Sequence, residues 1–209
     1  MSGEVPIDLR VRRATASDNA LLSRLGAETF FDPFAADNSL EDMAAYLSEA
    51  FNPGRQGHEL AEPASTFLVA EVAGLPVGYT RLKTGSAPEA VRGRKPIEIA
   101  RFYAQREWIG RRVGARLMEA CLVEALREEC DVVWLDVWER NYRAIGFYTG
   151  WGFEEVGSQA FQLGEDRQRD LVMARVLGCS QTEGGGRDGR HCSFEDQADG
   201  ASVRDAAGP

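Results

Sequence analysis

The sequence has no long apolar run. None of its stretches approaches the ~20 consecutive apolar residues that a membrane-spanning helix needs. The N-terminus likewise has no apolar core ahead of a small-residue cleavage site, which is the pattern of a secretory signal. We therefore expect a cytoplasmic protein with no membrane partner.

Residues that bind metals or form disulfides are also few. The four cysteines and two histidines include no CxxC pair and no metal-ligand spacing. Cys121 and Cys130 fall in a helical pattern, whereas Cys179 and Cys192 fall in a polar tail. A cytoplasmic location favours free thiols over a disulfide, and we expect no metal.

Basic charge is scarce as well. The 24 Lys and Arg residues are outnumbered by 33 Asp and Glu residues, which gives a formal net charge of -9. A nucleic-acid partner would select a basic face, so this charge argues against nucleic acid as a partner. It is compatible with a cationic substrate, although many acidic proteins have none.

What the chain does contain is one domain of strands and helices, expected at 1–178, followed by a polar tail at 179–209. The tail has one aromatic residue and no periodicity. It cannot bury enough surface to offset its ordering entropy, so we expect it to be disordered.

Alternating and apolar runs predict seven strands within the domain. Ala73-Gly74 separates the second run from the third as the tight turn of a β-hairpin would. The fifth run is apolar except for Asp136, which predicts a central strand. The runs are Ile7–Arg13, Thr66–Val72, Leu75–Lys83, Ile97–Tyr103, Val132–Trp138, Phe153–Leu163 and Arg169–Leu177.

Helical spacing of apolar residues predicts about four helices, two of them between the first and second strands. Other segments separate the elements: a break at Asp32-Pro33, a loop or short helical turn at Arg55–Ala64, and a loop at Thr84–Lys95. The expected helices are one from an N-cap at Ser17 through Phe30, one from a capping box at Ser39 and Asp42 to Phe51, one whose first turn carries Gly110–Ala115 and which reaches Leu126, and one at Asn141–Tyr148.

The join between the fourth strand and the third helix is the most informative stretch. The first turn of a helix presents unpaired backbone N–H groups and the positive end of the macrodipole. Small residues there let a phosphate approach the backbone, and arginines add positive charge. The pattern therefore predicts a pyrophosphate site. The residues at this turn are Gly110, Arg111, Arg112, Gly114 and Ala115.

The order of the elements, with a glycine-rich turn after the fourth strand and Phe147–Phe153 after the fifth, resembles the GNAT superfamily of N-acetyltransferases. The family's loop signature, Gln/Arg-x-x-Gly-x-Gly/Ala, falls on Ile109–Gly114, with Ile109 in place of the polar first residue and Arg112 in place of the middle glycine. The resemblance covers about 7–177. It implies an α/β fold with a central mixed seven-stranded sheet, splayed between strands 4 and 5, about four flanking helices, and acetyl-CoA wedged into the gap.

Two further segments are similar to the PaiA-type polyamine acetyltransferase branch of that superfamily. One is Val137–Tyr148 with the segments that follow it, and the other is Glu28–Phe34 with Asp42-Met43 and Tyr46-Leu47. The branch implies that the acetyl group moves directly to a primary amine of a small molecule, such as a polyamine, by general acid/base catalysis.

The resemblance also implies roles for individual residues. Tyr148 would be the general acid that protonates the departing CoA thiolate, although a core aromatic is the alternative. Glu98 would be the general base, because its spacing from Gly114 matches that of the base in the histone-acetylating branch; the alternatives are a water chain or a solvent-facing glutamate. A backbone N–H near Tyr103, freed by a bulge, would stabilise the developing negative oxygen. Cofactor contacts are implied for Phe102, Tyr103, Ala104, Ile109, Gly110, Arg111, Arg112, Val113, Gly114, Ala115, Asn141 and Tyr148.

Acceptor contacts are implied for residues on the two early helices, which the resemblance places over the acceptor site. Their carboxylates would pair with the distal ammonium groups of a polyamine, whereas a capping box and a solvated face are the alternative. The residues are Phe30, Asp32, Asp37 and Glu41.

Three functions stay open from the sequence. The first is an N-acetyltransferase acting on a small primary amine. The second is an acetyl-CoA-binding regulatory module with little turnover. This alternative is suggested by Ile109 and Arg112, which differ from the loop signature of the family. The third is a protein N-terminal or lysine acetyltransferase. The oligomeric state, a homodimer included, is open as well.

Overall fold

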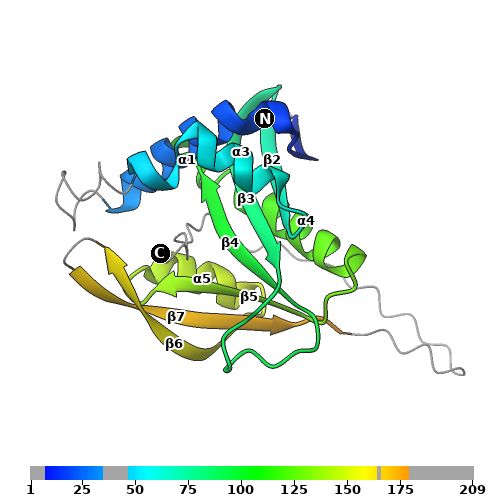
Figure 1. Cartoon of the computed structure of the whole chain (residues 1–209), viewed down its shortest axis with the longest axis vertical. Coiled ribbons are helices and arrows are strands. Elements are labelled where there is room, and N and C mark those ends of the chain that lie inside the picture. Colours follow the sequence, from blue (N-terminus) through cyan, green and yellow to red (C-terminus); the bar gives the residue numbers. More distant parts are fainter. Residues whose placement is uncertain (1–7, 35–46, 164–165, 179–209) are drawn as a thin grey trace, which may run out of the picture.

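The computed structural model in Figure 1 describes residues 8–34, 47–163 and 166–178. None of the helices in these ranges is both long and apolar enough to cross a membrane. Several predictions lie outside the described residues: those on Ile7, on Asp37 and Glu41, on the capping box at Ser39 and Asp42, on Cys179 and Cys192, and on the tail at 179–209.

One mixed sheet of seven strands forms the centre of the domain, as the resemblance implies. The spatial order is β1-β2-β3-β4-β5-β7-β6. Among the described strands, β4 and β5 are the parallel pair and every other neighbouring pair is antiparallel. The strands are β1 Leu9–Arg13, β2 Ser65–Val72, β3 Leu75–Thr84, β4 Pro96–Ala104, β5 Val132–Trp138, β6 Glu154–Leu163 and β7 Asp166–Val176.

Helices pack on both faces of this sheet (Figure 1). On one face, α4 (Val113–Arg127) and α5 (Tyr142–Gly150) contribute Leu117 and Phe147 to an apolar cluster that includes Leu135 of β5. We call this the α4 face. The opposite face, the α1 face, carries α1 (Asn19–Phe34) and α3 (Pro53–Ala61), and there Leu22 and Leu25 of α1 pack with Tyr79 and Tyr103.

The hairpin between β2 and β3 turns at Ala73-Gly74, as predicted. Ala73 has φ 49° and Gly74 has φ 79°, so both residues are in the left-handed region that a two-residue type I′ turn requires. The positions of all seven strands are likewise confirmed within a few residues.

Helix α3 occupies a segment for which the sequence predicts a loop or a short helical turn. Asn52 caps it, because its side-chain oxygen accepts a hydrogen bond from the Arg55 N–H at 2.8 Å, and Pro53 fits the first turn. The buried side chains of α3 are Gln56 and Glu59. Since neither is apolar, the segment lacks the periodicity from which helices are predicted.

Both ends of the first helix differ from the prediction. Thr15, not Ser17, is the N-cap, and it precedes a short 3-10 turn, η1 (Ala16–Asp18). The Asp18 carboxylate accepts hydrogen bonds from the Thr15 N–H at 2.7 Å and from Arg12 at 2.9 Å, so it fixes this start. At the other end α1 continues through Asp32-Pro33 to Phe34. Proline lacks a backbone donor and its ring clashes with the preceding turn, so α1 ends one residue after Pro33.

Candidate active site

The ladder between β4 and β5 is much shorter than either strand. It consists of three pairs, from Pro96 with Val132 to Glu98 with Trp134, although β4 continues to Ala104 and β5 to Trp138. Figure 1 shows the two strands diverging beyond this ladder. The sheet is therefore splayed between its fourth and fifth strands, as the resemblance implies.

The splay leaves backbone groups of β4 facing the gap. The Gln105 N–H donates to the Val77 carbonyl of β3 at 2.8 Å. Backbone N–H groups alternate in direction along a strand, so the N–H of Tyr103 points to β3, whereas the N–H groups of Phe102 and Ala104 point into the gap. The register shift of β4 against β3 lies at Ala100. The expected bulge is therefore three residues before Tyr103, and the splay is what turns the N–H groups of Phe102 and Ala104 away from a ladder.

Tyr148 lies beside this part of β4. It is fully buried on α5, and its ring meets that of Phe102 edge-on with a centroid distance of 6.1 Å. The rings of Phe147 and Phe153 hold it from two other sides, at 5.4 and 5.8 Å. Its hydroxyl has no hydrogen-bond partner among the described residues.

The surroundings of Tyr148 keep it protonated. Burial raises its pKa well above the usual value, and the neighbouring Cys121 thiol adds to the effect. Burial also raises the pKa of Cys121 to about 12, so this free thiol stays neutral. A buried O–H without an acceptor is unfavourable in a folded protein. The hydroxyl therefore fits a ligand whose acceptor atom reaches it through the gap.

The sequence predicts Gly110–Ala115 in the first turn of the helix after β4. In the structure Gly114 and Ala115 belong to the first turn of α4, whereas Gly110, Arg111 and Arg112 precede the helix. Gly110 has φ 83° and Arg112 has φ 66°, and α4 begins at Val113. The middle position of the loop signature thus has the left-handed geometry that glycine adopts without strain, and an arginine there costs about 1–2 kcal/mol. The turn keeps its shape despite the departure at Arg112.

The N-terminus of α4 suits an anion. Arg112 is its N-cap and makes no side-chain capping bond, so the first N–H groups of Val113, Gly114 and Ala115 have no intrahelical acceptor. Exposed Arg111, whose guanidinium lies 5.4 Å from the centre of the Trp108 ring, adds positive charge beside them. Ile109 ends η2 (Arg106–Trp108), the short turn between β4 and this site.

Asn141 begins α5 directly after β5. Its side-chain oxygen accepts a hydrogen bond from the Ala144 N–H at 3.2 Å, which caps the helix. The expected cofactor residue therefore also holds the helix that carries Tyr148.

Glu98 and Tyr148 lie on opposite faces of the sheet. Ile97 and Ile99 belong to the apolar cluster of the α4 face, which contains Tyr148, so the half-buried Glu98 between them points to the α1 face. Of the expected acceptor residues, Phe30 and Asp32 belong to the last turns of α1.

Sequence reasoning did not assign Asp136 to the site. It lies on the α1 face of β5, is 2% exposed, and accepts a hydrogen bond from Gln159 at 2.5 Å. Burial, followed by the charges of Glu98 and Asp170, raises its pKa to about 7. The signal in the sequence was the single charge in an otherwise apolar strand.

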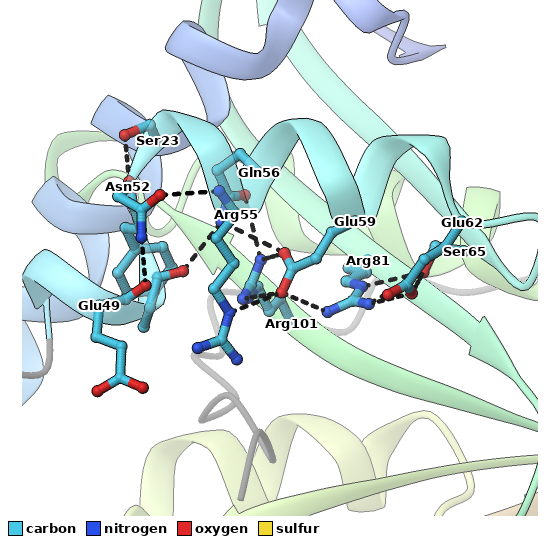
Figure 2. Close-up of polar contacts among 12 residues, drawn as sticks. Ser23, Glu49, Asn52, Arg55, Gln56, Glu59, Glu62, Ser65, Arg81 and Arg101 are labelled. Carbon is cyan, nitrogen blue, oxygen red and sulfur yellow. Dashed lines mark hydrogen bonds and ion pairs between the residues drawn. The ribbon is translucent and has the colours of Figure 1, made fainter. Parts of the chain in front are cut away.

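A second buried carboxylate on this face has the opposite environment (Figure 2). Glu59 of α3 takes two bonds from Arg101 of β4, at 2.5 and 3.1 Å, and an ion pair from Arg81 of β3 at 3.0 Å. Burial works against ionisation of Glu59, yet the charges of Arg101 and Arg81 outweigh it and its pKa is lowered. This network fixes α3 to the strand that borders the gap.

Known proteins share both the sequence pattern and the fold. A family model described as "Acetyltransferase (GNAT) family" matches residues 31–153. An uncharacterized N-acetyltransferase of Lactobacillus delbrueckii subsp. lactis is 35% identical over 153 residues, which are 73% of this chain and 88% of that protein.

Solved structures resemble the fold. PaiA N-acetyltransferase from Thermoplasma acidophilum, in complex with coenzyme A, superimposes with a TM-score of 0.68 at 18% identity, over 82% of this chain and 100% of that one. YncA from Salmonella typhimurium, solved with acetyl-CoA, gives 0.61 at 17% identity, over 86% and 98%. The chain therefore belongs to the acetyltransferase (GNAT) family and is an N-acetyltransferase that depends on acetyl-CoA.

Proposed function

We propose that the protein moves the acetyl group of acetyl-CoA directly to a primary amine of a small cationic molecule, such as a polyamine. Tyr148 is the general acid and Glu98 acts as a general base. The observation that carries this proposal is the buried Tyr148 hydroxyl, which has no acceptor among the described residues and lies against the splayed part of β4.

The cofactor residues follow the chain from β4 to α4. The N–H groups of Phe102 and Ala104 hold the pantetheine arm and the acetyl oxygen, since they face the gap. The N-terminus of α4, with Arg111 and Arg112, holds the pyrophosphate. Acetyl-CoA supplies the activated thioester.

The acceptor ammonium must lose a proton before attack, and the departing sulfur must gain one. An alkylammonium has a pKa near 10.4, so losing its proton at pH 7 costs roughly 4–5 kcal/mol. Glu98 accepts this proton on the α1 face. When the C–N bond forms and the C–S bond breaks, Tyr148 donates its proton to the sulfur from the α4 face. The two side chains lie on opposite faces because the amine and the thiol occupy opposite sides of the carbonyl carbon.

Charge supports a cationic acceptor. The α1 face presents Glu98 and Asp136 beside the gap, and the chain carries a net charge of -9. Because Glu59 is neutralised by Arg101 and Arg81, it does not contribute to this negative region. The left-handed backbone at Arg112 keeps the shape of the turn, which supports binding of acetyl-CoA.

Release of free thiol from acetyl-CoA tests the proposal with a panel of polyamines, amino acids and peptides. We expect turnover with polyamines and a lower kcat/KM for neutral peptides. Turnover with peptides alone would contradict a small-molecule acceptor. Calorimetric binding of acetyl-CoA without thiol release from any amine would favour the regulatory module instead.

A further inference from the structure

Asp136 is a charged side chain in a strand that is otherwise apolar and fully buried. Its Oδ2 accepts from the Gln159 Nε2 at 2.5 Å. Its Oδ1 is buried and has no hydrogen-bond partner among the described residues. A buried carboxylate with an unpaired oxygen is unfavourable unless it is protonated or accepts a hydrogen bond from a bound ligand.

Three strands bring their carboxyl groups together around this position. Glu98 pairs with Trp134 at the end of the β4–β5 ladder, so Asp136 is the next residue of β5 on the same face. Asp170 of β7 lies two residues from Val172, the direct partner of Asp136. From β6 the neutral Gln159 faces the group, and from β3 Lys83 lines the same cavity. No ion pair to Asp136 is found among the described residues.

A cavity of about 350 Å³ joins these groups to solvent. Glu98, Trp134, Asp136 and Gln159 form its sheet side, and Lys83 with the β3–β4 loop forms its other side. Gln159 is exposed, and it also borders a hollow of about 460 Å³ next to Trp138. A proton that reaches Asp136 thus has a polar route to water.

We propose that Asp136 and Glu98 act as one base: a carboxylate pair, at the point where β4 and β5 separate, that accepts the proton of the acceptor ammonium. The inference rests on the proposed function and adds a second residue to its base. One proton passes from the ammonium nitrogen to the pair and then through the cavity to solvent. The second leaves the nitrogen for the same pair as the C–N bond forms and also passes to solvent. Tyr148 gives its proton to the sulfur as the C–S bond breaks and recovers one from solvent after the products leave, so one proton is released for each acetyl group transferred.

The protonation behaviour of the site supports this role. Burial, Glu98 and Asp170 together raise the pKa of Asp136 to about 7. A general base is most effective when its pKa lies near the working pH. Because Glu98 contributes to the raised pKa of Asp136, removal of Glu98 lowers the pH at which Asp136 ionises.

The first test compares pH profiles of kcat/KM for wild type, Asp136→Asn and Glu119→Gln. The asparagine oxygen still accepts from Gln159, so the variant removes the ionisation and keeps the bond. Glu119→Gln is the matched control, because it removes a carboxylate on α4 that pairs with Arg116 at the surface.

Wild type should lose activity below about pH 7. This acidic limb of the pH profile reports a group of the protein, because the amine titrates near 10.4. Asp136→Asn should lower kcat at least 10-fold and abolish the loss of activity near pH 7, because the group that titrates there is gone. Glu119→Gln should match wild type. An unchanged rate and an unchanged limb in Asp136→Asn would overturn the proposal.

The second test does not need an acceptor. Carbon-13 NMR of the Asp136 carboxyl in the free enzyme, assigned with Asp136→Asn, should show a midpoint of about 7 that falls in Glu98→Gln. A wild-type midpoint below 5, or one that Glu98→Gln leaves unmoved, would overturn the pair. If wild type turns over no amine, the proposed function fails, and this titration still decides whether the pair exists.

Discussion

Two buried carboxylates on the α1 face of the sheet have opposite electrostatic environments. Glu59 meets Arg101 and Arg81, and its pKa is lowered. Asp136 meets two further acids, and its pKa is raised to about 7. Both residues are buried, with 5% and 2% exposure. Burial alone therefore does not decide the charge of a group; the charges of its neighbours do.

The largest effect is expected where a neutralised charge loses its partner. Glu59→Gln removes the carboxylate that pairs with the fully buried Arg101 and with Arg81, and removing one member of a buried pair costs about 3–5 kcal/mol. Denaturant unfolding measures this loss. The exposed pair of Arg10 and Asp8 provides the control, since Arg10→Gln should change the free energy of unfolding by no more than about 1 kcal/mol. A loss below about 1 kcal/mol in Glu59→Gln would mean that the network contributes little.

A smaller effect with a defined pH dependence is expected for Asp136→Asn. The folded-state pKa of about 7 lies above the unfolded value of about 3.9, so the folded protein binds this proton more tightly. The protonated Asp136 therefore contributes to the free energy of unfolding below pH 4, and this contribution is lost as the pH rises through 7. Wild type should lose on the order of 3 kcal/mol relative to Asp136→Asn between pH 4 and pH 8.

Unfolding of both proteins across this pH range measures the difference. If the two curves run parallel, Asp136 titrates at the same pH folded and unfolded. The contrast with Glu59 would then disappear.

The smallest effect is expected at Gln159. Its hydrogen bond lowers the pKa of Asp136 against the other influences. Gln159→Leu should therefore raise the NMR midpoint of Asp136, by less than about one unit, because the bond to the charged form is lost. A midpoint that falls would show that Gln159 does not stabilise the ionised carboxyl.

Local patterns were sufficient to predict most of the fold. Alternation placed the strands, and Ala73-Gly74 marked the hairpin, because both signals depend on neighbouring residues. Helix α3 was missed because its buried side chains are polar, and Arg101, the residue that neutralises Glu59, lies 42 positions further along the chain. No window of the sequence contains both partners.

The candidate site, like the fold, has features that the sequence indicated and features that only the folded structure shows. The resemblance named Tyr148 and the turn at Arg112, and the left-handed geometry of that turn explains why a glycine is usual there. Asp136 was visible as a lone charge in β5. Its raised pKa was not, because Glu98 and Asp170 come from two other strands and meet it only in the folded sheet.

The most direct test of the central claim, that acetyl transfer uses the buried hydroxyl at the splay, is the kcat of Tyr148→Phe. The variant keeps the ring that packs against Phe102 and removes the proton donor. We expect kcat to fall on the order of 100-fold while calorimetry shows acetyl-CoA affinity lowered by less than about 10-fold, the loss of one hydrogen bond. A variant with full kcat and the same affinity would contradict the role of Tyr148 as the general acid.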